Sequence, residues 1–236
     1  MSVTDFHTHI LPSIDDGSDS VETSLLMLER QMAQGIKKVV VTPHFYPSSD
    51  NPDHFLSKRS SVYQKLKDAA KEKNNLPELV LGAEVYFFEG ISDCEYLSQM
   101  AIENTRCVMI EMPFKHWSDR NLSELVGIKQ KLGLVPVLAH VDRYVRPFSY
   151  KKTFDRLSGL PVIIQVNSSF FINKSTRRCA LKLLKQGKIH ILGSDCHNET
   201  SRVANIGAAL EIIKKAQGEK TVTLMQEFEK MIFEKV

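Results

Sequence analysis

The chain has 236 residues, of which 42% are hydrophobic and 25% are charged, a balance typical of a globular protein. No apolar run of about 18 or more residues is present, and the first residues lack a basic segment followed by an apolar run, so neither a membrane span nor a signal peptide is predicted. The net charge of +3 comes from scattered lysines rather than from a basic block, so no nucleic-acid partner is expected. The four cysteines have no CxxC spacing and form no disulfide framework, which favours a reducing, cytoplasmic compartment.

Short runs of β-branched and aliphatic residues, each bounded by turn residues, predict seven strands. Most of the runs are continuously apolar, which is typical of strands buried on both faces of a parallel sheet. The predicted strands cover residues 2–8, 37–42, 79–85, 107–111, 135–139, 161–166 and 189–193.

Helical patterns lie between these strands. Apolar residues recur at spacings of three and four over residues 21–32, and Gly35 follows, so we expect a helix that ends near this glycine. Similar patterns predict helices over residues 119–133, 173–188 and 221–236.

Strands that alternate with helices through right-handed crossovers produce either an open doubly wound sheet or a closed barrel. The lack of a glycine-rich dinucleotide motif favours the barrel. No linker rich in proline, glycine or serine divides the chain. We therefore predict an α/β fold, a TIM-like (β/α)7 barrel that forms a single domain over residues 1–236.

Side chains that can bind metals lie at the carboxyl ends of six of the seven predicted strands, and only the sixth strand ends in a neutral residue, Asn167. In a βα barrel the carboxyl ends of the strands meet at one face. Burying so many charges together is costly unless cations neutralise them. The candidate ligands are His7, His9, His44, Glu84, Glu111, His140, Asp195 and His197, together with Asp16 from the first loop.

Nine candidate ligands exceed what one cation uses, so we expect two or three divalent metal ions. Imidazoles mixed with carboxylates suit Mn, Fe, Zn or Mg. Cys196 lies between two candidate ligands, but alternate residues of an extended segment point to opposite sides, so its thiol is expected to face away. Asp5 and Asp15 are not expected to be ligands, and His54, His116 and His190 are expected to be surface or packing residues.

Six motifs taken together resemble the polymerase and histidinol phosphatase (PHP) superfamily. They are "DFHTHILPSIDDG", "TPH", "GAEV", "IEMP", "LAHVDRY" and "GSDCHN". Within that superfamily the chain resembles the bacterial manganese-dependent protein-tyrosine phosphatases of capsule and exopolysaccharide operons, the CpsB-like group. The resemblance implies a distorted TIM-like barrel with a three-metal site. Asp16 stands where the histidinol phosphatases usually have a histidine, which favours the tyrosine-phosphatase branch.

The resemblance also assigns ligands to each metal, with Mn as the expected ion. It implies a first metal held by His7, His9, Glu84 and Asp195, a second held by Glu84, Glu111 and His140, and a third held by Asp16, His44 and His197.

Several adjacent cations suit phosphoester hydrolysis, because they activate a water molecule and neutralise the phosphoryl oxygens. Arg143 and Arg202 follow two of the ligands, and their planar donors match phosphate oxygens. Arg146 is a weaker third candidate. His44, Asp16 or another member of the cluster is expected to protonate the leaving group.

The resemblance implies that the substrate is phosphotyrosine on the tail of a cognate bacterial tyrosine kinase. Aromatic residues of loop 45–55 could stack on the tyrosyl ring or could serve packing alone. The sequence does not indicate an oligomeric state.

Other functions remain open at this point. Cys196 and Arg202 have the C-x5-R spacing of cysteine-dependent phosphatases, but the stretch between them lacks the glycine-rich phosphate loop that such enzymes need. A small-molecule phosphomonoesterase of the histidinol-phosphate type and a PHP phosphodiesterase would use the same ligands. Amidohydrolases also begin with HxH, but none of the predicted strand ends carries their typical lysine. A barrel with structural metals that serves as a binding module is the non-enzymatic alternative.

Overall fold

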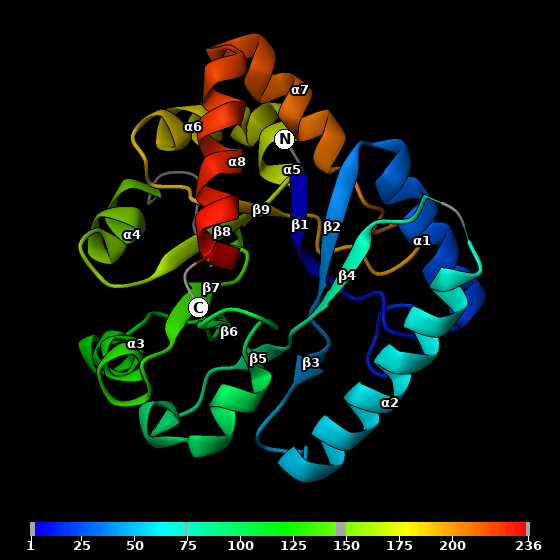
Figure 1. Cartoon of the computed structure of the whole chain (residues 1–236). Helices are drawn as coiled ribbons and strands as arrows, with labels where there is room; N and C mark the ends of the chain where they lie inside the picture. The colour runs from blue at the N-terminus through cyan, green and yellow to red at the C-terminus, as the bar shows by residue number, and fades with distance from the viewer. Residues whose placement is uncertain (1–2, 74, 145–149, 235–236) are drawn as a thin grey trace.

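Parallel strands alternate with helices through the computed structural model, which describes residues 3–73, 75–144 and 150–234 (Figure 1). The strands are β1 (Val3–Thr8), β2 (Ile36–Val41), β3 (His44–Phe45), β4 (Glu78–Leu81), β5 (Glu84–Tyr86), β6 (Cys107–Glu111), β7 (Val135–Leu138), β8 (Ile163–Asn167) and β9 (Ile191–Gly193). The α-helices are α1 (Val21–Ala33), α2 (Pro52–Lys71), α3 (Asp119–Leu132), α4 (Tyr150–Leu157), α5 (Ser169–Ile172), α6 (Lys174–Lys185), α7 (Ile206–Gln217) and α8 (Glu219–Glu234). Short 3-10 helices are η1 (Ile91–Asp93), η2 (Glu95–Met100) and η3 (Val141–Tyr144).

The strands pair in parallel and follow one another around a ring. One sheet has the order β1-β2-β4, and the other has the order β3-β5-β6-β7-β8-β9. β2 leads into β3, and β4 leads into β5, so the first sheet continues into the second. The ring closes where Thr8 of β1 pairs with Cys196, just after β9, and the Asp195 N–H donates to the His7 carbonyl over 2.8 Å. The predicted distorted barrel is therefore confirmed.

The prediction of one strand over residues 79–85 is wrong, because that stretch is divided into β4 and β5. The neighbouring strand is interrupted at the same level, where Pro43 has no N–H to donate to the ladder. The buried Arg59 guanidinium also binds the Gly82 carbonyl from outside at 3.0 Å. His44 therefore starts a short strand of its own beyond the predicted end at residue 42.

The predicted helices begin and end close to the expected residues. Ser20 caps α1 by accepting a hydrogen bond from the Thr23 N–H, and Gly35 follows the helix with a φ of 82°. Gly133 ends α3 with a φ of 68°, a conformation that glycine adopts without strain. Among the helices in the described ranges, none combines the length and the hydropathy that a membrane crossing needs.

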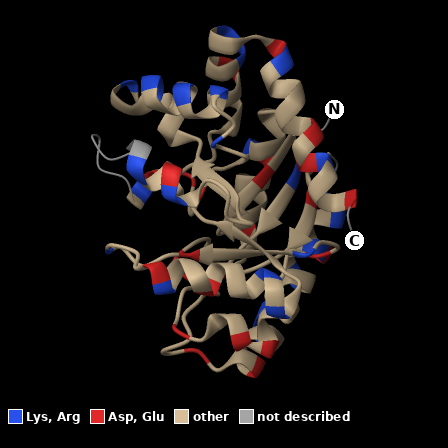
Figure 2. Cartoon of the chain, turned by 90° about the vertical axis from the view of Figure 1, so that its left-hand side faces the viewer, with Lys and Arg blue, Asp and Glu red and all other residues tan. Residues whose placement is uncertain are grey.

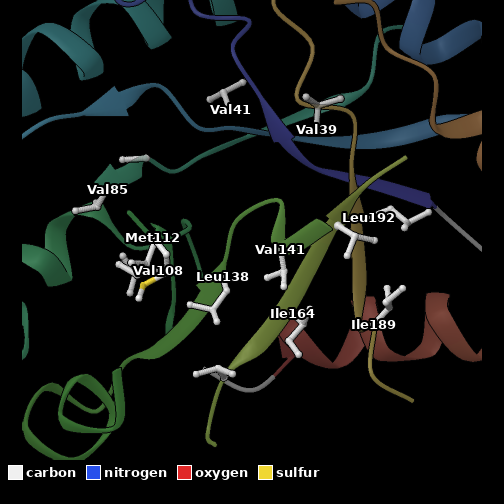
Figure 3. Packing of buried hydrophobic residues seen from close by; sticks show 14 of the residues in the cluster. Val39, Val41, Val85, Val108, Met112, Leu138, Val141, Ile164, Ile189 and Leu192 are labelled. Carbon is white, nitrogen blue, oxygen red and sulfur yellow. The ribbon is translucent and has the colours of Figure 1, made fainter. Parts of the chain in front are cut away.

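Two hydrophobic clusters support the strands. The larger one lies between strands and helices, and Figure 3 shows Val108, Leu138, Ile164 and Leu192 from four successive strands within it. The smaller cluster contains inward residues of the strands and is closed by Ile232 of α8. Charged residues lie mainly along the helices, as Figure 2 shows.

Inward positions change character along β6 and β8. In β6, Cys107 and Met109 belong to the smaller apolar cluster, and Glu111 follows two positions later. In β8, Ile163 belongs to that cluster, and Gln165 is the next inward residue. The amino ends of the strands therefore enclose an apolar floor, while the carboxyl ends present polar groups.

Candidate metal centre

The nine candidate ligands gather at the carboxyl ends of the strands. Seven of them are at least 95% buried, the His44 side chain is 13% exposed, and the Asp16 side chain is 63% exposed at the rim. The seven buried residues are His7, His9, Glu84, Glu111, His140, Asp195 and His197.

Glu84 of β5 is the centre of this cluster. Its Oε2 lies 3.1 Å from His7 Nε2, 3.3 Å from His9 Nε2 and 3.0 Å from His44 Nδ1. Its Oε1 lies 2.9 Å from His140 Nε2. One carboxylate thus faces four imidazoles, the arrangement expected of a bridging ligand.

Carboxylates complete the cluster on three sides. Asp195 Oδ1 lies 3.5 Å from His9 Nε2, and Glu111 Oε1 lies 3.6 Å from His140 Nε2. At the rim, Asp16 Oδ1 lies 3.3 Å from His197 Nε2. The predicted ligands are therefore all brought together.

The donor atoms suit divalent cations. His7 Nε2 and His9 Nε2 face each other at 3.1 Å, although at most one proton can lie between two such nitrogens. Within the described residues, four buried cluster atoms make no hydrogen bond, and distances such as the 3.0 Å between His44 and Glu84 lack hydrogen-bond geometry. Ligand atoms within 4.8 Å of one another form three groups, which are His9, Asp16, His44 and His197; His7, His9 and Asp195; and His44, Glu84 and Glu111. Three such groups of nitrogen and oxygen donors fit two or three metal ions.

Close packing shifts the pKa values of these groups in opposite directions. Burial acts to raise the pKa of Glu84, but the surrounding imidazoles outweigh it and lower that pKa well below its usual range. Burial, and then the charge of Glu84, raise the pKa of Glu111 to about 7. Burial acts to lower the pKa of His9, but Asp15 and Glu84 outweigh it and raise it to about 10. Protons therefore compete for the atoms that would bind metal.

Asp15 orients two of the candidate ligands. It is one of several residues whose supporting role was not predicted from the sequence. Burial acts to raise its pKa, but hydrogen bonding to His9 outweighs it and lowers the pKa to about 2, so Asp15 is an acceptor. Its Oδ2 accepts from His9 Nδ1 at 2.8 Å and from the His44 N–H at 3.0 Å. The Nε2 atom of His9 is thereby left to face the cluster.

An amide pair on β8 supports three further ligands. Gln165 Oε1 accepts the His140 N–H at 2.5 Å and lies 3.2 Å from His7 Nδ1. Gln165 Nε2 donates to Asn167 Oδ1 at 3.1 Å, and Asn167 Nδ2 donates to Asp195 Oδ2 at 3.0 Å. The sequence signal was the alternation of two amides within the apolar run "IIQVN".

Asp5 is buried and supports the strand end that carries Asp195. It was not expected to be a ligand, and its carboxylate binds protein groups instead. Its Oδ1 accepts the Ser194 N–H at 2.8 Å, and its Oδ2 accepts from Gln31 Nε2 at 2.6 Å. The backbone at Asp195 has a φ of 54° and that at His140 a φ of 31°, a region that non-glycine residues rarely occupy. Two ligand positions thus carry backbone strain of the kind that clusters at functional sites.

Both predicted arginines lie beside the cluster. Arg143 Nη2 donates to Asp195 Oδ2, and Arg202 Nη2 donates to Asp195 Oδ1 at 2.8 Å. Their side chains are 33% and 36% exposed, so both guanidinium groups reach the surface of the cluster. Arg146 lies outside the described residues.

Cys196 is fully buried, and its thiol faces α1 rather than the cluster. Its Sγ lies 3.8 Å from Gln31 Nε2. Burial, and then the nearby Asp5 carboxyl, raise the pKa of this thiol far above its usual range. A protonated, enclosed thiol cannot serve as a nucleophile.

The three other histidines lie outside the cluster. His190 Nδ1 accepts from the Ile164 N–H at 2.8 Å, and His116 Nε2 lies 3.5 Å from Arg156 Nη1. His54 is exposed on α2. These positions agree with the surface or packing roles expected of them.

Loop 45–55 combines packing residues with one residue at the site. Phe45 and Phe55 are buried in the larger core cluster. Tyr46 is 36% exposed, and its ring stacks on His44 with the centroids 5.0 Å apart. The 63% exposed Phe114 likewise stacks on His140, with the ring centroids 6.2 Å apart. The cluster is thus flanked by two accessible aromatic rings.

Residues 3–232 match the model of a protein family described as "Capsular polysaccharide synthesis, CpsB/CapC". The chain belongs to the CpsB/CapC family. The tyrosine-protein phosphatase CpsB of Streptococcus agalactiae is 26% identical over 227 residues, covering 92% of this chain and 91% of that protein.

Solved structures share the fold of this CpsB/CapC chain. A crystal structure reported for YwqE of Bacillus subtilis and CpsB of Streptococcus pneumoniae, described as metal-dependent tyrosine phosphatases, has a TM-score of 0.86 at 22% identity and covers 98% of this chain and 94% of that chain. Histidinol phosphate phosphatase from Lactococcus lactis, solved with zinc, L-histidinol and phosphate, has a TM-score of 0.58 at 16% identity and covers 91% and 93%. The resemblance to the CpsB-like group drawn from the motifs is confirmed by the family match.

Proposed function

We propose that this chain is a metal-dependent protein-tyrosine phosphatase, a phosphoric monoester hydrolase without a cysteine nucleophile. The observation that carries the proposal is the cluster of buried imidazoles and carboxylates with two guanidinium groups on Asp195. Membership of the CpsB/CapC family and relatives named tyrosine-protein phosphatases support it.

The proposed cofactors are two to three divalent metal ions, with Mn first and Fe, Zn or Mg as alternatives. Glu84 is the proposed bridge, because its two oxygens face different imidazoles. When bound, the ions activate a water molecule and neutralise the phosphoryl oxygens. The proposed ligand sets are His7, His9, Glu84 and Asp195 for the first metal, Glu84, Glu111 and His140 for the second, and Asp16, His44 and His197 for the third.

Arg143 and Arg202 are the proposed phosphate-binding residues. Both guanidinium groups already donate to the Asp195 carboxylate. A phosphoryl group has more acceptor oxygens than a carboxylate, and the same planar N–H donors can bind them. Asp16 at the rim and the largely buried His44 are the proposed donors of a proton to the leaving tyrosyl oxygen, which has a pKa near 10 in free tyrosine.

Two exposed aromatic rings support an aromatic substrate. Tyr46 and Phe114 each stack on a candidate metal ligand, and a tyrosyl ring bound beside either of them would gain offset or edge contacts. We infer that loop 45–55 contributes to substrate binding through Tyr46, while its two phenylalanines serve packing.

The proposed physiological substrate is phosphotyrosine on a cognate bacterial tyrosine kinase of capsule or exopolysaccharide synthesis. The family description supports the pathway. A single domain over residues 1–236 and a cytoplasmic location remain part of the proposal, and four free cysteines support a reducing compartment.

The decisive experiment removes the metals with a chelator and adds back Mn, Mg, Zn and Fe separately. We expect hydrolysis of a phosphotyrosine peptide to disappear and to return, most strongly with Mn. Histidinol phosphate and single-stranded DNA are tested in parallel, since the alternative phosphomonoesterase and phosphodiesterase would prefer them. If the fold depends on metal but no metal restores any hydrolysis, the result would favour a binding module with structural metals.

A further inference from the structure

A cavity of about 470 Å³ opens directly beside the metal-ligand cluster. Asp16 and His44 line its inner end, and His54 and Lys58 of α2 line it on the helix side. In Figure 1 this region lies near the bottom of the view, where β3 leads into α2. The volume falls in the range of pockets that enclose small ligands, about 300–1,000 Å³, and therefore leaves room for more than a phosphoryl group.

The carboxylates of this cavity already have partners. Asp15 binds His9 and two backbone N–H groups, and Asp50 Oδ2 accepts the Tyr46 N–H at 2.6 Å. Asp16 faces His44 and His197 of the cluster. None of the three therefore needs a cation from α2.

Lys58 is the lysine of the cavity, and it is exposed. Within residues 3–73, 75–144 and 150–234, no carboxylate lies within 4.0 Å of its Nζ. His54 lies one helical turn before it, so both side chains share the face of α2 that borders the cavity. The cavity thus joins a phosphoryl-binding end to an end with a free ammonium group.

We propose that this cavity binds an aspartate or glutamate side chain of the substrate peptide, close in sequence to the phosphotyrosine. The inference rests on the proposed tyrosine-phosphatase function. With the phosphoryl group at the cluster and the tyrosyl ring beside Tyr46, the neighbouring peptide residues enter the cavity, where Lys58 pairs with their carboxylate. His54 adds a ring N–H donor at the same end.

The test is a set of phosphotyrosine peptides with a neutral background. One glutamate is placed in turn at each of the two positions before and after the phosphotyrosine, and each peptide is compared with its glutamine counterpart. Because exposed ion pairs are weak, we expect a preference of about 1.4-fold to fivefold in kcat/KM for glutamate at one position, carried mainly by KM.

Two substitutions of the lysine identify the partner. Lys58→Met should abolish the preference for glutamate over glutamine, and Lys58→Glu should transfer it to a lysine-containing peptide. Lys65→Met is the matched control, because Lys65 lies on the same face of α2 about 10 Å further along the helix and does not line the cavity. That control should retain the preference.

The outcomes separate the inference from the proposed function. Equal hydrolysis of all glutamate and glutamine pairs by the metal-loaded wild type, or a preference that survives Lys58→Glu, overturns the inference and leaves the phosphatase proposal intact. Hydrolysis of none of the peptides, with histidinol phosphate or DNA cleaved instead, overturns both.

Discussion

Substitution of Gln165 by leucine tests whether the neutral amide beneath the cluster holds the ligands in place. Gln165 is fully buried, and its Oε1 accepts the His140 N–H and faces His7 Nδ1. Leucine has a similar volume and no acceptor. Gln165→Leu therefore leaves two buried donors without their partner and changes no charge.

The magnitude follows from these two contacts. A buried donor left unsatisfied costs about 1–3 kcal/mol, so we expect the free energy of unfolding to fall by roughly 2–6 kcal/mol. Loss of the group that orients a metal-binding imidazole typically weakens metal binding by about 10–100-fold, or about 1.4–2.7 kcal/mol. Both effects should appear in the same variant.

Two assays measure these effects. Urea unfolding of the chelated protein gives the free energy, and competition with a chromophoric chelator gives the metal affinity. Gln64→Leu, on the exposed side of α2, is the matched control and should change neither quantity appreciably. A Gln165→Leu variant with the metal affinity of this control would refute the positioning role of the β8 amide.

Two further predictions concern buried titratable groups. Cys196→Ser should retain most phosphatase activity, whereas His140→Ala should lose it; a dead Cys196→Ser enzyme that is insensitive to chelators would reverse the mechanism. Burial raises the pKa of Glu229, whose carboxylate accepts the Thr4 N–H, to about 8, against about 4.3 for a free glutamate. Between these two pH values the folded state binds one proton more than the unfolded state, so this group lowers the free energy of unfolding as the pH rises. Glu229→Gln should therefore be more stable than wild type by ~2–4 kcal/mol at pH 7 and by little at pH 4. If urea unfolding gives a stability difference between the two proteins that does not change with pH, the prediction is contradicted.

The barrel and the clustering of the candidate ligands were predictable because both leave local signals. Buried parallel strands read as apolar runs, and a histidine or carboxylate at the end of such a run is unusual enough to stand out, as His140 and Glu84 do. The same logic placed Arg143 and Arg202 beside the cluster, since short loops keep near neighbours in sequence close in space.

The divided strands and the supporting residues were not predictable by that reasoning. The break between β4 and β5 depends on Pro43 in the adjacent strand and on Arg59 from a distant helix, so no local pattern in residues 79–85 reveals it. Asp15 and Gln165 act through partners elsewhere in the sequence. Aspartate and glutamine are also common on protein surfaces, so the residue type alone does not reveal such a role. Their roles emerge only when the ring of strands brings those partners within hydrogen-bond distance.

Closure of the ring between β9 and β1 sets the order in which a nascent chain can acquire its metal-binding ability. Asp5 and Ser194, which meet at this closure, are separated by 189 positions in the sequence. His7 and His9 are synthesised long before β9, the strand that closes the ring beside them. Such a long-range contact forms late, because a large loop must be closed before it is gained. We therefore expect metal loading to follow the synthesis of β9, and truncations before β9 should yield chains with most of the candidate ligands but no assembled centre.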